Sequence, residues 1–222
     1  MTYCVGMALS RGLVLMSDTR TNAGVDNIST FRKMFHWEVP GERIIAIMTA
    51  GNLATTQSVI SQLEERNKAP GDRHNSLLDA PSMFQIAGIV GRLLRETIQS
   101  QDAENGQTGS GAFAASIIVA GQIGGMEPRM FLIYPEGNFI EASGDTPFFQ
   151  IGETKYGRPI LLRGYGGNIK GPALVDPGAH DLFYIGGGQD RDQVLCAEDM
   201  VATLAARGSF LSVEDFARHR GD

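Results

Sequence analysis

The side chain from which we first expect chemistry is the second residue of the chain, Thr2. Its small size favours removal of Met1, which frees an α-amine beside the threonine hydroxyl. Such an amine has an ordinary pKa of about 7.7 to 8.0, so it can act as a base near neutral pH. A threonine hydroxyl activated by its own amine is an established nucleophile–base pair. Because many chains begin with Met-Thr, this residue alone does not separate a nucleophile from an ordinary second residue.

Other catalytic motifs are absent from the sequence. It contains no GxSxG elbow, no P-loop and no GxGxxG, even in the glycine-rich stretch 164–171. The histidines lack the HExxH spacing, and the two cysteines, Cys4 and Cys196, form no CxxC pair. The sequence therefore predicts neither a metal site nor a cofactor, and no disulfide framework.

The elements that must position Thr2 follow from the apolar pattern. Short apolar runs separated by turn residues predict two hairpins at the start of the chain, with strands over 3–9, 13–17, 34–39 and 43–50. Asn52 is a plausible helix N-cap, and the apolar residues at spacings of three and four after Ser82 predict a second helix. Strands return over 114–120, 130–134 and 139–142. The stretches 67–81 and 102–111 are expected to be loops, and 18–32 is a polar stretch between the two hairpins.

This order of strands, two helices and strands indicates a layered α+β fold. A chain of 222 residues without internal repeats is expected to form one domain, over 1–222. Its formal net charge is -6 and it has no basic run, which argues against nucleic-acid binding. No secretory leader and no apolar run of membrane-span length is present, so we expect a cytoplasmic protein without a membrane.

Several longer strings resemble a known family. Asp18-Thr19-Arg20, Phe31-Arg32-Lys33-Met34 and Thr49-Ala50-Gly51-Asn52 resemble the pattern of proteasome β-subunits. The runs 21–33 and 131–161 are more closely similar to Anbu, the bacterial proteasome-related family also called the ancestral β-subunit. This resemblance implies a four-layer αββα sandwich, with two antiparallel sheets between helix layers, as in the N-terminal-nucleophile hydrolases.

The resemblance also implies a role for each matched residue. Thr2 would be the nucleophile, Lys33 would favour its deprotonated hydroxyl, Asp18 would hold Lys33 charged, and the backbone N–H of Gly51 would stabilise the oxyanion. Proteasome subunits place a supporting serine after a glycine where this chain has Gly152-Glu153, so Glu153 is a weaker candidate of unassigned role. Each residue also has a structural interpretation: a surface lysine, or a residue in a turn.

The match ends near Leu162. Residues 163–222 depart from the family pattern, either as a divergent tail or as the product of a shifted reading frame. A strand over 182–185 and helices over 193–206 and 211–218 are expected there. Asp176 and Asp181 are available as a supporting aspartate but lie in no recognisable motif.

Three functions remain open at this stage. The first is a threonine peptidase or amidohydrolase of the proteasome type, acting on peptides or unfolded proteins. The second is a catalytically silent, self-assembling scaffold or binding protein with the same fold, and the third is an amidase acting on a small amide. Family resemblance implies a homo-oligomer, either a ring or an open spiral, and leaves an ATPase partner undetermined.

Overall fold

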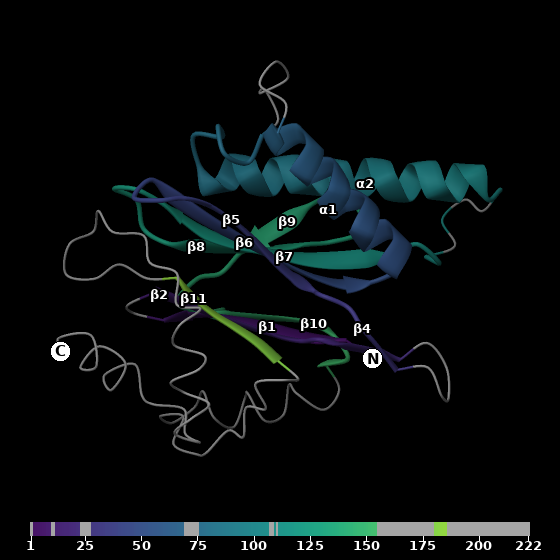
Figure 1. Cartoon of the computed structure of the whole chain (residues 1–222), viewed down its shortest axis with the longest axis horizontal. Coiled ribbons are helices and arrows are strands. Elements are labelled where there is room, and N and C mark those ends of the chain that lie inside the picture. The colour runs from purple at the N-terminus through teal and green to yellow at the C-terminus, as the bar shows by residue number, and fades with distance from the viewer. Residues whose placement is uncertain are drawn as a thin grey trace.

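A computed structural model describes residues 2–9, 12–22, 28–68, 76–106, 109, 111–154 and 180–185. In this part of the chain two antiparallel sheets lie face to face, and two helices cover the outer face of one of them (Figure 1). The α+β class and the two antiparallel sheets predicted from the sequence are confirmed. A helix layer on the other sheet, expected from 193–206 and 211–218, lies outside the described residues.

The sheet that carries Thr2 has the strand order β10-β1-β2-β11. Its strands are Phe148–Gly152 (β10), Tyr3–Leu9 (β1), Gly12–Asp18 (β2) and His180–Ile185 (β11). The sheet under the helices has the order β5-β6-β7-β8-β9, with strands Met34–Val39, Arg43–Gly51, Ala115–Ile123, Arg129–Ile133 and Phe139–Glu141. Arg20–Asn22 (β3) and Ile28–Thr30 (β4) form a separate two-stranded ribbon.

The central strands of the second sheet are buried on both faces. On β6, Ile45 and Ile47 join the core under the helices, whereas Ile44 and Met48 join the core between the two sheets. Successive side chains of a strand point to opposite faces, so a strand between two cores must be apolar throughout. The apolar run Ile117 to Ala120 of β7 has the same cause, and the sequence predicted this strand to be buried on both faces.

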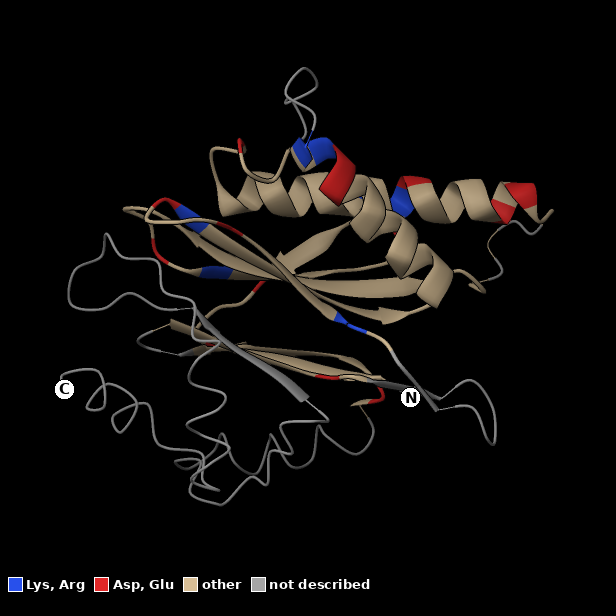
Figure 2. Cartoon of the chain, viewed as in Figure 1, with Lys and Arg blue, Asp and Glu red and all other residues tan. Residues whose placement is uncertain are grey.

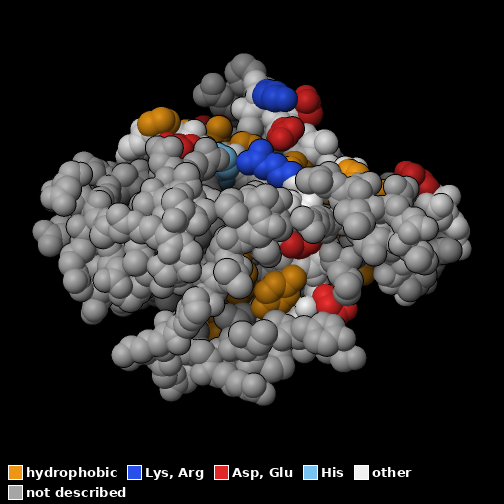
Figure 3. Space-filling model, turned by 60° about the horizontal axis from the view of Figure 1, so that its bottom comes forward, with side chains coloured by type: hydrophobic (Ala, Val, Ile, Leu, Met, Phe, Trp, Pro, Cys, Tyr) orange, Lys and Arg blue, Asp and Glu red, His pale blue; other side chains and the backbone are white. Residues whose placement is uncertain are grey.

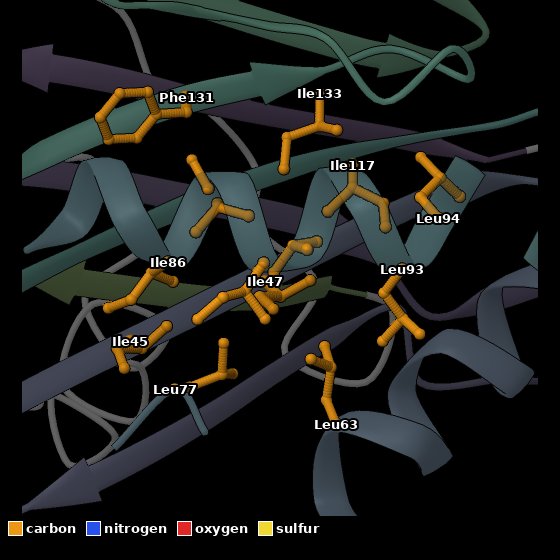
Figure 4. Packing of buried hydrophobic residues seen from close by; sticks show 14 of the residues in the cluster. Ile45, Ile47, Leu63, Leu77, Ile86, Leu93, Leu94, Ile117, Phe131 and Ile133 are labelled. Carbon is orange, nitrogen blue, oxygen red and sulfur yellow. The ribbon is translucent and has the colours of Figure 1, made fainter. Parts of the chain in front are cut away.

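Helix α1 (Leu53–Lys68) and helix α2 (Met83–Glu104) begin where side chains cap them. The Asn52 Oδ1 accepts the Thr55 N–H at 3.1 Å, and the Ser82 hydroxyl accepts the Gln85 N–H at 3.3 Å. These contacts satisfy N–H groups that have no partner within a helix. Figure 4 shows the labelled leucine and isoleucine side chains of α2 between the helix and the sheet.

Three strands were not predicted from the sequence. β3 and β4 lie within the polar stretch 18–32, for which no element was predicted, so the prediction of four strands before the first helix is wrong: the described residues form six. β10 was also missed; it alternates Phe149 and Ile151 toward the core between the sheets. These strands are short, and their pairing partners lie far along the chain or within a polar ribbon, so the local pattern of apolar residues is weak.

Figure 2 marks charged residues in the last turns of helix α1, along helix α2 and near the ends of several strands. In the second sheet, Arg129 of β8 donates two hydrogen bonds to Glu141 of β9, and this bonding raises the pKa of the Arg129 guanidinium. Within the described ranges, no helix is both long and apolar enough to cross a membrane.

Replacing Leu93 by alanine tests the core under the helices. Leu93 is 1% exposed, so Leu93→Ala removes buried methyl groups and leaves a cavity. We expect a loss of about 2 to 5 kcal/mol in the free energy of unfolding, measured by urea denaturation. Met126→Ala is the control, because Met126 is 47% exposed and should change stability by less than about 0.5 kcal/mol. Equal losses in the two variants would contradict the assignment of this core.

Candidate active site

Thr2 directly precedes β1, and its backbone continues the pairing of β1 with β10. Tyr3 is paired with Gly152, and the next N–H along, that of Glu153, donates to the carbonyl oxygen of Thr2 at 2.6 Å. Gly152 has a φ of 88°, and a Cβ atom at this position would overlap the Thr2 carbonyl. Only glycine adopts this backbone conformation without strain, and only glycine leaves room here for Thr2.

Asp18, at the end of β2, connects the backbone beside Thr2 to a lysine. Its Oδ1 accepts the backbone N–H of Tyr3 at 2.7 Å, and its Oδ2 accepts a hydrogen bond from the Lys33 Nζ at 2.5 Å. A carboxylate that bridges two donors in this way is held in one orientation. The structure therefore brings Asp18 and Lys33 together beside the residue that follows Thr2.

Lys33 is a buried cation. Its side chain is 5% exposed, against 21% for that of Asp18. Its carbonyl oxygen accepts the N–H of Thr49 at 2.9 Å, which ties the segment before β5 to β6. Burial disfavours an isolated ammonium group, so the carboxylate of Asp18 is what allows Lys33 to stay charged here.

Gly51 lies at the end of β6 with a φ of 117°. Thr49 donates its N–H toward the β5 side, and since alternate N–H groups of a strand point the same way, the Gly51 N–H points there too. β5 begins at Met34, which pairs with Met48, so the strand does not extend far enough to pair with Gly51. No hydrogen bond from the Gly51 N–H to the described residues was found. On its other side, a Cβ at Gly51 would come within 2.5 Å of the Ala114 carbonyl oxygen.

Two hydroxyl groups near Thr2 were not recognised from the sequence. Ser17 is fully buried and pairs with Cys4, and the Ser17 Oγ and the Thr19 Oγ1 are buried without a hydrogen-bond partner among the described residues. Leu13, Leu15 and Ser17 are buried at alternate positions of β2. That alternation was the signal available in the sequence, because Thr19 continues the same spacing of two.

Cys4 links the two sheets beneath this site. Its thiol donates to the carbonyl oxygen of Thr49 at 3.7 Å, and it is fully buried. Tyr3 points to the opposite face, where its hydroxyl donates to the Gln150 Oε1 at 3.1 Å. Burial, followed by the electrostatic effect of Cys4, raises the pKa of the Tyr3 phenol.

The remaining candidates of the C-terminal region are placed only in part. Asp176 lies outside the described residues. Asp181 lies on β11, and its Cα pairs with that of Ser17, whereas the expected strand over 182–185 is found over His180–Ile185. Within the described residues, no cluster of three or more His, Cys, Asp or Glu side chains is suited to bind a metal ion.

The face of the molecule shown in Figure 3 has acidic, basic and hydrophobic side chains close together among the described residues.

The described part of the chain has two stacked antiparallel sheets and a helix layer outside one of them. A threonine directly precedes β1, the first strand. These features define a proteasome-related β-subunit fold of the N-terminal-nucleophile type. Comparison with solved structures agrees. The chain is 37% identical to Anbu (ancestral beta-subunit) from Yersinia bercovieri, with a TM-score of 0.71 and 92% of each chain covered. The chain belongs to the Anbu family.

Two further solved structures support this assignment. An Anbu (Gly-1) mutant from Hyphomicrobium sp. strain MC1 is 37% identical, with a TM-score of 0.70, and covers 99% of this chain and 96% of its own. The helical assembly of the Anbu complex from Pseudomonas aeruginosa is 37% identical, with a TM-score of 0.70 and coverages of 92% and 91%. No family model and no curated protein matched the chain.

The ion pair can be tested by a double-mutant cycle. Asp18→Asn leaves the buried ammonium without its carboxylate, and Lys33→Met leaves the carboxylate without its ammonium. We expect each single change to lower the free energy of unfolding by about 2 to 4 kcal/mol, since one charge stays buried. The double variant should lose less than the sum of the singles, by about 1 to 3 kcal/mol. Additive losses by urea denaturation would show that the two groups do not interact.

The contact between Gly152 and Thr2 can be tested with a matched glycine. Gly41 also has a positive φ, of 76°, but a Cβ there meets nothing within 4 Å. Gly41→Ala should therefore cost only the strain of that conformation, about 1 kcal/mol. Gly152→Ala adds a clash with the Thr2 carbonyl, so it should destabilise the protein more and speed hydrogen exchange at the Glu153 amide. Equal effects of the two substitutions would contradict this contact.

Proposed function

We propose that this protein is a threonine-type N-terminal-nucleophile hydrolase that cleaves peptide or other amide bonds after Met1 has been removed. The observation that carries the proposal is the position of Asp18, which accepts hydrogen bonds from both the Tyr3 N–H and the Lys33 ammonium. It fixes a buried positive charge next to the residue that would become the N-terminus. Membership of the Anbu family supports the same reaction class.

In the proposed reaction, the Thr2 hydroxyl attacks the carbonyl carbon of an amide. The Thr2 α-amine takes the hydroxyl proton, directly or through water, and the ammonium of Lys33 favours the oxygen that has lost its proton. The C–N bond of the tetrahedral intermediate then breaks, and the leaving amine receives that proton. The products of this step are a free amine and an ester between the substrate acyl group and Thr2.

Water completes the cycle. The α-amine accepts a proton from a water molecule, which attacks the ester carbonyl, and the proton returns to the Thr2 oxygen as the C–O bond breaks. Gly51 would stabilise the oxyanion formed in both steps through its backbone N–H. Removing a single donor of this kind costs about 2.7 to 4 kcal/mol in other enzymes.

A second candidate function rests on assembly. One solved Anbu structure is a helical assembly from Pseudomonas aeruginosa. We propose that this chain also forms a homo-oligomer, a ring or an open spiral, which would enclose the sites in a sheltered space. A catalytically silent scaffold with this fold is the alternative to the hydrolase.

We propose a cytoplasmic location and a single domain over 1–222. The proposed substrates are peptides or unfolded proteins, and a small amide is the other substrate class.

The nucleophile is tested by intact-protein mass and a β-lactone probe, which acylates an activated threonine. We expect the purified protein to lack Met1 and to gain one probe molecule. Thr2→Ala should abolish this labelling, because the reacting oxygen is gone. Thr146→Ala is the control, since Thr146 is an exposed threonine of the segment before β10 and should label like the unmodified protein.

Two outcomes would reject the hydrolase. Retention of Met1 would leave Thr2 without a free amine, and labelling that persists in Thr2→Ala would place the reactive group elsewhere. Assembly measured by light scattering in the unlabelled protein, with no labelling in any variant, would favour the scaffold.

A further inference from the structure

Glu153 lies directly opposite Thr2 in the ladder that continues β1 and β10. The register pairs Cys4 with Ile151 and Tyr3 with Gly152, so the next pair outward is Thr2 with Glu153. The Glu153 N–H donates to the Thr2 carbonyl at 2.6 Å, which fixes this pair. The backbone of Glu153 is therefore the neighbour of the Thr2 backbone on the β10 side.

The Thr2 side chain lies on the face turned toward the second sheet. Cys4, two positions further along β1, joins the core between the sheets, and strand side chains alternate with a period of two. Gly152, with a φ of 88°, ends the regular geometry of β10, and Glu153, which follows it, is exposed.

The backbone nitrogen of Thr2 is also on the Glu153 side. Tyr3 directs its N–H toward β2, where it donates to Asp18. Neighbouring N–H groups along a strand point in opposite directions, so the Thr2 nitrogen is directed toward β10 and its continuation at Glu153. Once Met1 is removed, this nitrogen becomes the α-amine.

The charges around this nitrogen leave one carboxylate in excess. Asp18 and Lys33 form an ion pair and cancel each other. From β1 the neighbouring titratable groups are the Tyr3 phenol, directed to the opposite face, and the buried Cys4 thiol. Arg32, before β5, is exposed and donates to the Met34 carbonyl oxygen, and the described end of β6, with Gly51 and Asn52, has no titratable side chain. Among the described residues, Glu153 is thus the carboxylate without an ion-pair partner on the side to which the nitrogen points.

We propose that the carboxylate of Glu153 pairs with the α-ammonium group of Thr2 and favours its protonated form, so that Glu153 restrains the base of the active site at neutral pH. This inference rests on the proposed function, because it concerns the amine that would accept the hydroxyl proton. Glu153 acts here as a positioning residue: it holds the ammonium in place, and deprotonation of the amine must first overcome this attraction. The pH at which the site becomes reactive is therefore higher than the α-amine alone would require.

The test compares Glu153→Gln with the unmodified chain, both produced from a cleavable fusion that leaves Thr2 as the first residue. The glutamine keeps the backbone N–H to Thr2 and the length of the side chain and removes only the charge. The pKa of the α-amine is measured by NMR titration of ¹⁵N-labelled threonine. We expect Glu153→Gln to lower this pKa by about 0.5 to 1 unit, the shift expected when a partly exposed opposite charge is removed.

Glu38→Gln is the matched control. Glu38 is an exposed carboxylate on β5, five residues beyond Lys33, so it lies about 17 Å along the strand from the site. The Glu38→Gln substitution removes one negative charge from the chain, as Glu153→Gln does, and should leave the pKa of the Thr2 amine unchanged. Equal pKa values in Glu153→Gln and the unmodified chain, or equal shifts in Glu153→Gln and Glu38→Gln, would overturn the proposal.

A second measurement separates this proposal from the proposed function. If Thr2 reacts with the β-lactone probe, the acid limb of the labelling rate should move to lower pH in Glu153→Gln by the same amount as the pKa. The labelling rate well below the pKa should then rise about 3- to 10-fold, since each unit changes the fraction of free amine tenfold. Absence of labelling in every variant would reject the hydrolase, whereas the NMR titration would still decide whether Glu153 pairs with the amine.

Discussion

The structure around Thr2 depends on the two hydrogen bonds that Asp18 accepts. One comes from the backbone of β1 and the other from the ammonium of Lys33. A single carboxylate thus joins the sheet that contains β1 to the segment that leads into β5. Lys33 in turn is tied to β6 through the Thr49 N–H. Because a buried charge is stable only with a partner, the packing of the two sheets and the charge state of the site are determined together.

Two glycines let the backbone approach this site from both sheets. Gly152 in the first sheet and Gly51 in the second have positive φ values, and each faces a carbonyl oxygen where a Cβ has no room. Gly152 thereby allows the backbone after β10 to lie in close contact with the Thr2 carbonyl. Gly51 lets the chain turn from β6 into helix α1, and the N–H of Gly51 is not paired with β5. The same residue type thus has two separate uses, one steric and one concerned with the direction of an N–H group.

The fold was predictable from the sequence where the apolar pattern is local and strong. The hairpins β1–β2 and β5–β6, the N-cap at Asn52 and the helix after Ser82 all follow from neighbouring residues. β10 was not predictable in this way, because its partner β1 lies more than a hundred residues earlier in the chain and its own run is short. β3 and β4 pair only with each other, and their residues are mostly polar, so no buried face marks them in the sequence.

The residues of the site were likewise predictable from the sequence only in part. Asp18 and Lys33 were found from sequence strings that resemble a family, and the structure pairs them. Ser17 and Thr19 were missed because a polar residue on an otherwise apolar strand face does not itself indicate which groups lie opposite. The place of Glu153 follows from the pairing of β1 with β10 and from the hydrogen bond of its N–H to the Thr2 carbonyl, which together set the direction of the Thr2 nitrogen. The glutamate after Gly152 therefore acquires its proposed role only through this pairing: its carboxylate would lie beside the amine, which must give up a proton before it can serve as a base.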